Sequence, residues 1–183
     1  MQVRRFFASR EIVYTVRMTT HSVLLTNRAL LRLSGRDARS WLQALVTNDV
    51  ENLAAGQGRY AALLTPQGKI IADFFVVPDG ETLLIDCPAQ LAEALAKRLA
   101  MYKLRADVAI APVADLAVAA AWGDAPPAVG RAIVYVDPRC ASMGWRIIGE
   151  ARELDLMGLS PDEAESYAAL RIANCVPEGG VDF

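Results

Sequence analysis

An aspartate within an apolar strand is the first residue whose setting suggests chemistry. Asp73 lies in the segment Ile70–Val77, whose other residues are all apolar, as is typical of a strand covered on both faces. A buried carboxylate is costly unless a partner compensates its charge. Two interpretations stay open. Asp73 either pairs with nearby Lys69 or Arg105 or reaches water at a strand edge, or it is held in a partly dry pocket to accept a ligand N–H or manage a proton.

Tyr60 and Asp86 pose related questions in neighbouring segments. Tyr60 begins the preceding strand, where a tyrosine is either a half-buried core or edge residue or, under a flat ligand, a stacking platform with a polar tip. Asp86 stands near the end of an apolar run and close to Pro88, which favours an exposed aspartate or one that caps the next helix. Asn48-Asp49 predicts a turn after a helix.

Three cationic residues could hold an anionic ligand. Lys103 and Arg105 follow a helix, and they either complement its dipole or form a patch for an anionic tail such as a glutamate chain. Arg171 lies between Leu170 and Ile172 on a late helix. Its charged head either reaches solvent along its aliphatic stem or grips an acid.

Histidine and cysteine usage excludes several kinds of site. The single histidine, His21, excludes a multi-histidine metal site and a second imidazole base. Cys87, Cys140 and Cys175 show no CxxC spacing, so they match neither a zinc pattern nor a secreted disulfide framework, and they indicate a reducing compartment. Each is first interpreted as a small buried hydrophobic residue. We therefore expect no metal site.

Length and composition favour one folded region. The chain has 183 residues, of which 54% are hydrophobic and 22% charged, which excludes disorder as the main state. A net charge of −2 argues against a protein whose main task is to coat nucleic acid or an acidic membrane. No apolar run is long enough for a helix that spans a bilayer. We expect neither nucleic acid nor membrane as a partner.

The expected elements are runs of strands separated by single helices. Strands are expected at 23–26, 29–33, 59–65, 69–77, 82–87, 107–111, 116–122, 131–136 and 144–149, and helices from 38, at 89–101 and at 160–173. This order predicts an α+β fold with a mainly antiparallel sheet and flanking helices, and it disfavours a Rossmann domain.

The two ends of the chain differ from the middle. Residues 1–18 are expected to be a disordered N-terminal extension or the product of a mis-called start with Met18 as the true start; an arginine-rich transit peptide is the alternative. Residues 19–183 are expected to form the folded region. Ser160 and Glu163 predict a capping box at the last helix. The final segment, Val181–Phe183, begins an element that stops, which suggests a chain cut short.

Blocks of residues at 35–38, 41–43, 46–50, 64–73, 102–108, 167–172 and 176–180 stand in register, within a match that spans about residues 23–183. They resemble the YgfZ/GcvT-type folate-binding proteins. The resemblance implies a GcvT-like folate-binding fold of intertwined subdomains, tetrahydrofolate or a folate derivative as cofactor, and a role in iron–sulfur cluster assembly or repair. Two alternatives stay open: an aminomethyltransferase of the glycine cleavage T-protein class, and a non-catalytic interaction module.

The resemblance also implies roles for individual residues. Asp73 matches the aspartate beside the reactive nitrogens of folate, which makes it the catalytic candidate, and Tyr60 matches a tyrosine of the folate pocket. Ile85 and Cys87 align with a pocket wall, where Cys87 replaces an asparagine. Arg171 matches the arginine of the late helix. The pterin ring is expected to stack beside Tyr60 and Ile85, while Arg171 or the cations after the second helix take the glutamate tail.

The match has limits that shape the functional expectation. The KGC(Y/F)xGQE signature of the YgfZ branch and the C-terminal β-barrel of the family both follow the matched region, and this chain ends at Phe183. We therefore expect the chain to lack the role of the signature thiol and to be aminomethyltransferase-like at most. The expected partners are a folate and iron–sulfur client or scaffold proteins. The expected location is the cytoplasm, with the mitochondrial matrix as the alternative.

Overall fold

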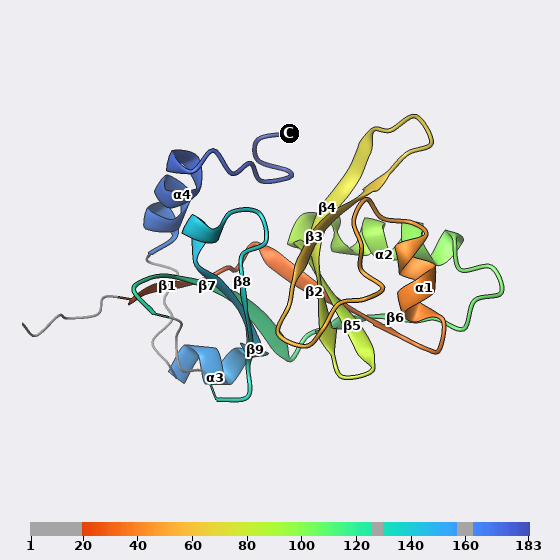
Figure 1. Cartoon of the computed structure of the whole chain (residues 1–183), viewed down its shortest axis with the longest axis horizontal. Coiled ribbons are helices and arrows are strands. Elements are labelled where there is room, and N and C mark those ends of the chain that lie inside the picture. The colour runs from red at the N-terminus through yellow and green to blue at the C-terminus, as the bar shows by residue number, and fades with distance from the viewer. Residues whose placement is uncertain (1–19, 126–129, 157–162) are drawn as a thin grey trace, which may run out of the picture.

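Two antiparallel sheets lie side by side and each carries its own helices (Figure 1). The computed structural model describes residues 20–125, 130–156 and 163–183. The expectations for residues 1–18 and for a capping box at Ser160 lie outside these residues. Every strand pair within the described ranges is antiparallel. This confirms the predicted α+β class with a mainly antiparallel sheet.

The four-stranded sheet has the order β1-β7-β9-β8. Its strands are β1 (Thr20–Leu24), β7 (Leu116–Gly123), β8 (Ile133–Val136) and β9 (Trp145–Glu150). Small residues of β7, together with Ile147 of β9, form a buried cluster on one face of this sheet. Helix α3 (Ala151–Leu156), which the sequence did not predict, follows β9 directly and packs Leu154 into the same cluster.

The five-stranded sheet has the order β3-β4-β5-β2-β6. Its strands are β2 (Arg28–Ser34), β3 (Arg59–Leu64), β4 (Ile70–Asp79), β5 (Thr82–Pro88) and β6 (Ala109–Val113). The two N-terminal strands thus do not pair with each other, because β1 pairs with β7 in one sheet and β2 pairs with β5 and β6 in the other. The short turn between them carries the chain from one sheet to the other.

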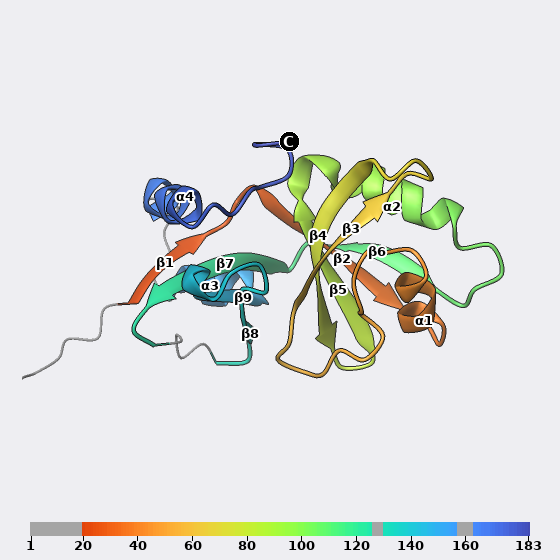
Figure 2. The ribbon, with the colours of Figure 1, turned by 45° about the horizontal axis from the view of Figure 1, so that its top comes forward.

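Helices cover the outer face of the five-stranded sheet. Helices α1 (Ala38–Gln43) and α2 (Ala92–Met101) lie at that sheet in both ribbon views (Figures 1 and 2). Pro88 comes directly before a 3₁₀ turn, η1 (Ala89–Leu91), so the expected helix at 89 becomes regular only at Ala92. A second 3₁₀ turn, η2 (Ala141–Met143), follows β8, and α4 (Ala164–Ala173) packs near β1.

The strand alternation assigns each side chain of the central strands to one of two cores. Phe74 and Val76 of β4 pack with Leu95 and Leu99 of α2 in the core under the helices. Their neighbours Phe75 and Val77 instead pack with residues of the four-stranded sheet. Strand β4 is therefore apolar on both sides because helices cover one face and the second sheet covers the other.

None of the helices in the described ranges combines the length and the apolar character that crossing a bilayer requires.

Candidate functional site

The structure brings Tyr60 and Asp73 together on the face of the sheet that is turned toward the second sheet. In the β3–β4 hairpin Ala62 lies opposite Asp73 and Tyr60 opposite Phe75, which makes Tyr60 and Asp73 diagonal neighbours. The Tyr60 hydroxyl donates a hydrogen bond of 2.8 Å to Asp73 Oδ2. Burial, followed by the contact with Asp73, raises the pKa of Tyr60, so the phenol keeps its proton and remains a donor.

Asp73 has no cationic partner among the described residues. Its side chain is 5% exposed, and its described hydrogen bond comes from the neutral Tyr60 hydroxyl. The ion pair with Lys69 or Arg105 is therefore not formed. An ionised carboxylate offers about four acceptor positions, so Asp73 keeps capacity to accept further N–H groups. This residue is a buried acceptor whose bonding is incomplete.

A turn from the C-terminal segment closes over Asp73. A Cβ atom built on Gly179 would overlap Asp73 Oδ1, so the backbone of this turn lies directly against the carboxylate. Arg171 holds the turn, since it donates to the Val176 carbonyl and forms ion pairs with Glu178 and Asp182. The turn, rather than a cation, is what removes Asp73 from water.

A cavity of about 460 Å³ opens beside Tyr60. It is bounded by the start of β3, the loop after β8 and the turn after α4. Its lining residues are Asn48, Tyr60, Pro138, Arg139, Cys140, Asn174, Cys175, Val176 and Pro177. The guanidinium of Arg139 lies 5.9 Å from the centre of the Tyr60 ring. The cavity thus offers an aromatic ring, a cation and two thiols, and it lies within the size range of small-molecule sites.

Asp86 is fully buried, so the expectation of an exposed or helix-capping aspartate was wrong. Arg28 Nε donates to Asp86 Oδ1 at 2.7 Å, and Arg146 Nη2 donates to Oδ2 at 2.5 Å. The alternation of β5 explains the error, because it turns Asp86 toward the second sheet, where β9 supplies Arg146. Burial alone would raise the pKa of Asp86, but the attraction of Arg146 and Arg28 outweighs burial and lowers it.

The two arginines belong to a network that continues to the cavity. Arg139 binds Asp137 with Nη2 at 2.7 Å, and Arg146 lies 3.9 Å from the same carboxylate. The guanidinium groups of Arg28, Arg139 and Arg146 lie 5.6, 4.9 and 4.0 Å from the centre of the Phe75 ring. Arg139 is the member of this network that also lines the cavity, where its guanidinium lies next to the Tyr60 ring.

Ile85 and Cys87 are not brought to this cavity. Both are fully buried on the opposite face of β5, in the core under the helices. Burial and the neighbouring Asp86 raise the pKa of the Cys87 thiol to about 12. The strand period of two explains this outcome, since Asp86 faces the second sheet and both its neighbours must then face away.

The remaining candidates are divided between the cavity and other parts of the molecule. Asn48 lines the cavity, where its Nδ2 donates to the Tyr60 carbonyl and its Oδ1 accepts from Asp49 N. Arg171 grips acids of its own C-terminal segment. Lys103 and Arg105 follow α2 and do not line the cavity.

Sequence reasoning missed Arg28, Arg139 and Arg146. Arg146 interrupts the apolar segment Trp145–Ile148, and this is the same signal that identified Asp73, so it could have been found. Arg139 lies in a loop whose composition gives no comparable signal.

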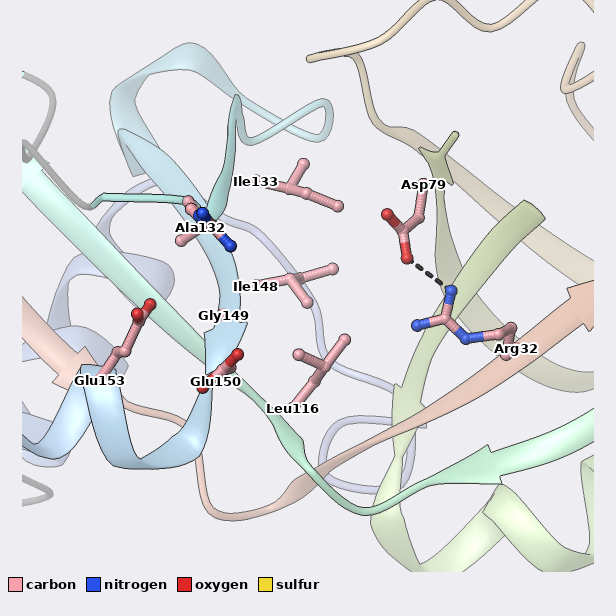
Figure 3. Close-up of a pocket in the computed structure, with 10 residues that line it drawn as sticks. Arg32, Asp79, Leu116, Ala132, Ile133, Ile148, Gly149, Glu150 and Glu153 are labelled. Carbon is pink, nitrogen blue, oxygen red and sulfur yellow. Dashed lines mark hydrogen bonds and ion pairs between the residues drawn. The ribbon is translucent and has the colours of Figure 1, made fainter. Parts of the chain in front are cut away.

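A second cleft, of about 160 Å³, lies between the sheets on the side where β4 ends (Figure 3). Leu116, Ile133 and Ile148 of the four-stranded sheet point toward Arg32 and Asp79 across it (Figure 3). Arg32 and Asp79 already pair with each other at 2.5 Å. This cleft is smaller and the Arg32–Asp79 pair at its wall is already formed, so the cavity at Tyr60 is the better candidate site. In the described part of the chain no group of three or more His, Cys, Asp or Glu residues could hold a metal ion.

Comparison with known proteins gives named relatives. The "Iron-sulfur cluster assembly factor IBA57 homolog, mitochondrial" of Pyricularia oryzae is 35% identical over 171 residues, which cover 87% of this chain and 44% of that protein. Human "Iron-sulfur cluster assembly factor IBA57, mitochondrial" is 31% identical over 183 residues, which cover 87% of this chain and 51% of that protein. The chain thus spans about half the length of these curated relatives.

A solved structure and a family model agree on the fold. The crystal structure of glycine cleavage system aminomethyltransferase T from Bartonella henselae matches with a TM-score of 0.60 at 15% identity, over 87% of this chain and 47% of that chain. This match confirms the predicted GcvT-like fold. The model of the GCVT N-terminal domain matches residues 10–148. Since these residues are most of the chain, the protein belongs to the GCVT N-terminal domain family.

Proposed function

We propose that the protein binds tetrahydrofolate, or a related folate, in the cavity beside Tyr60 and supports iron–sulfur cluster assembly or repair. The observation that carries the binding proposal is Tyr60, which lines a cavity of about 460 Å³ and donates a hydrogen bond to the buried Asp73 behind it. A pterin is flat and rich in N–H groups. The Tyr60 ring offers a stacking surface, and Asp73 offers unused acceptor positions.

Folate binding at Asp73 requires the covering turn to move. The Asp73 carboxylate lies under Gly179, whereas the open cavity begins at Tyr60. A pterin that stacks on Tyr60 reaches Asp73 only when the turn at Gly179 shifts. Arg139 is the cation that lines the cavity, so we assign it the electron-rich end of the ligand. Arg171 stabilises the turn through Glu178 and Asp182 instead of reaching the ligand.

The iron–sulfur role rests on the relatives. Those reported above carry iron–sulfur cluster assembly in their names, which supports a role on the YgfZ-like side of the family. Their names also include "mitochondrial", which supports the matrix alternative and gives no support to the cytoplasm. The aminomethyltransferase alternative has only a fold match at 15% identity behind it. Iron–sulfur client or scaffold proteins are the partners that follow from this proposal.

Calorimetric titration with tetrahydrofolate tests the site. We expect Asp73→Asn to weaken binding by about tenfold or more, since it removes a buried polar interaction of about 1–3 kcal/mol. Tyr60→Ala should also weaken binding, since it removes the ring on which the pterin stacks. Asp79→Asn is the matched control, because Asp79 ends the same strand and its side chain is 37% exposed. Equal affinity of parent and Asp73→Asn would remove Asp73 from the site. A parent chain that binds no folate would contradict the binding proposal and favour an interaction module.

Disruption of the gene in its native host tests the cellular role. The expected result is a selective loss of activity in enzymes that carry iron–sulfur clusters, with enzymes that lack clusters unaffected. An equal loss in both groups would contradict a role in cluster assembly.

A further inference from the structure

Two free cysteines line the same cavity. Cys140 lies directly before η2, and Cys175 lies in the turn after α4. Both border the cavity beside Tyr60. Cys140 also packs against the apolar cluster that contains Val176, the residue next to Cys175. The fold therefore brings to one cavity two thiols that are far apart in sequence.

Cys175 occupies a backbone position that favours glycine. The chain leaves α4 through hydrogen bonds from Cys175 N to the Ile172 carbonyl and from Val176 N to the Arg171 carbonyl. This pair of bonds is the Schellman motif, whose left-handed residue is usually glycine. Cys175 has φ +53° and is exposed. A cysteine kept in a strained, solvent-facing position gains nothing from packing, which points to a use for its thiol.

The third cysteine is chemically separate. Cys87 is fully buried, and burial raises the pKa of its thiol to about 12. Because the thiolate is the reactive form, Cys87 is inert toward oxidants. Cys140 is partly exposed and Cys175 exposed, so oxidants in solution reach these two.

We propose that Cys140 and Cys175 form an oxidative modification site that takes a hydroperoxide as its oxidant. The thiolate sulfur of Cys175 attacks one peroxide oxygen, the O–O bond breaks, and the leaving hydroxide or alkoxide takes a proton from solvent, so the products are a sulfenic acid and water or an alcohol. The thiol of Cys140 then attacks the sulfenic sulfur, an S–S bond forms, and the sulfenic hydroxyl leaves as water with the proton of the thiol. The two sulfur atoms lose two electrons in total, and the peroxide gains them. A dithiol reductant reverses the reaction.

The expected consequence concerns the ligand cavity and rests on the proposed function. A disulfide would tie the loop after β8 to the turn after α4, and these are two of the walls of the cavity. The tie would hold Arg139, the neighbour of Cys140, and would draw the turn across Tyr60. Oxidation should therefore close the folate cavity, and reduction should open it again.

Peptide mapping of the full chain tests the modification itself. After treatment with hydrogen peroxide, mass spectrometry should show the loss of two hydrogen atoms and one cross-linked peptide that joins Cys140 to Cys175. Cys140→Ser should lose the cross-link and retain an oxidised Cys175. The absence of the cross-link in the parent chain, or a cross-link that includes Cys87, would overturn the proposal.

The Cys175→Gly variant removes the thiol and should leave the fold intact, so it shows which effects depend on the thiol. Glycine suits the left-handed position, so we expect this variant to melt no lower than the parent and to form no cross-link. Its folate affinity should not respond to peroxide.

Titration with 5-formyltetrahydrofolate, after removal of the peroxide, tests closure of the cavity. The oxidised parent should bind at least tenfold more weakly than the reduced parent, and dithiothreitol should restore its affinity. A cross-link that leaves affinity unchanged would overturn the closure. If the reduced chain binds no folate, the proposed function fails, and the peptide map still decides whether the modification site exists.

Discussion

At the scale of single residues, two aspartates on neighbouring strands show how partners decide chemistry. Asp73 and Asp86 both face the second sheet, and both are buried. Asp86 meets two guanidinium groups, so its acceptor positions are engaged and its role is to hold the sheets together. Asp73 meets one neutral hydroxyl and keeps unused acceptor positions. The residue available to a ligand is therefore Asp73.

Acid should destabilise the protein through Asp86. Burial would raise the pKa of Asp86, but attraction to Arg146 and Arg28 holds it below its ordinary value of 3.8. Because the folded pKa is the lower one, the ion pairs stabilise the fold fully above the unfolded pKa. This stability is lost as the pH falls through the folded pKa. Urea unfolding at a series of pH values should show the free energy of unfolding falling below pH 3.8.

The Asp86→Asn variant tests whether Asp86 causes this loss of stability in acid. It should be less stable than the parent at neutral pH and should lose less stability in acid. Asp107→Asn is the control, because Asp107 pairs with Arg36 at the exposed surface and should leave most of the acid response in place. An acid response that is identical in the parent and in Asp86→Asn would contradict the assignment.

At the scale of elements, the turn after α4 connects the helix to the site. Arg171 reaches from α4 to the Val176 carbonyl and to the acids at Glu178 and Asp182, so it links the end of the helix to the turn. Gly179 is the point where this turn meets β4, and the absence of a side chain there allows the backbone to lie against Asp73. The element that covers Asp73 is thus anchored at one end and closely packed at the other.

Gly179→Ala should lift the turn from Asp73. The added methyl group would overlap the Asp73 carboxylate, so the turn must shift, at a cost of about 1–3 kcal/mol in the free energy of unfolding. Hydrogen exchange should show faster exchange at Val176–Phe183. Val181→Ala is the control in the same segment, since Val181 is 66% exposed and should change neither quantity. Unchanged exchange in Gly179→Ala would show that the turn does not depend on this contact.

At the scale of the whole molecule, buried charges join the two sheets. Arg28 and Asp86 belong to the five-stranded sheet, Arg146 belongs to β9 of the four-stranded sheet, and Arg139 follows β8. The hydroxyl of Tyr167 accepts from Arg139 and Arg146, which extends the network to α4. Because each partner is desolvated, removal of one member leaves others uncompensated. The cavity depends on this union, since its walls come from both sheets.

Arg146→Met should strongly destabilise the protein. Methionine fills part of the volume, but Asp86 loses its contact of 2.5 Å, and we expect a loss of about 3–5 kcal/mol in denaturant unfolding. Arg32→Met is the control, because the Arg32–Asp79 pair is about one third exposed and should contribute under about 1 kcal/mol. Similar losses in both variants would show that the buried network does not hold the sheets together.

The sequence by itself determined the local part of this protein. Alternation of apolar residues predicted most strands and the β3–β4 hairpin. The α+β class followed from the same pattern. These features depend on neighbours close in the chain, and period and turn chemistry are sufficient to predict them. Tyr60 and Asp73, however, share one face only because the register shifts between Leu63 and Leu64, which the pattern did not predict.

Only the tertiary structure decided which side chains distant in the sequence contact one another. Asp86 binds Arg28 and Arg146 at separations of 58 and 60 residues, which reversed the expectation of an exposed residue. The same packing separated Ile85 and Cys87 from the cavity, bound Arg171 to its own segment and brought Cys140 and Cys175 to one cavity. The physical reason is that the charge and burial of a side chain depend on what packs against its face. In this protein that neighbour belongs to a second sheet whose strands are distant in the sequence.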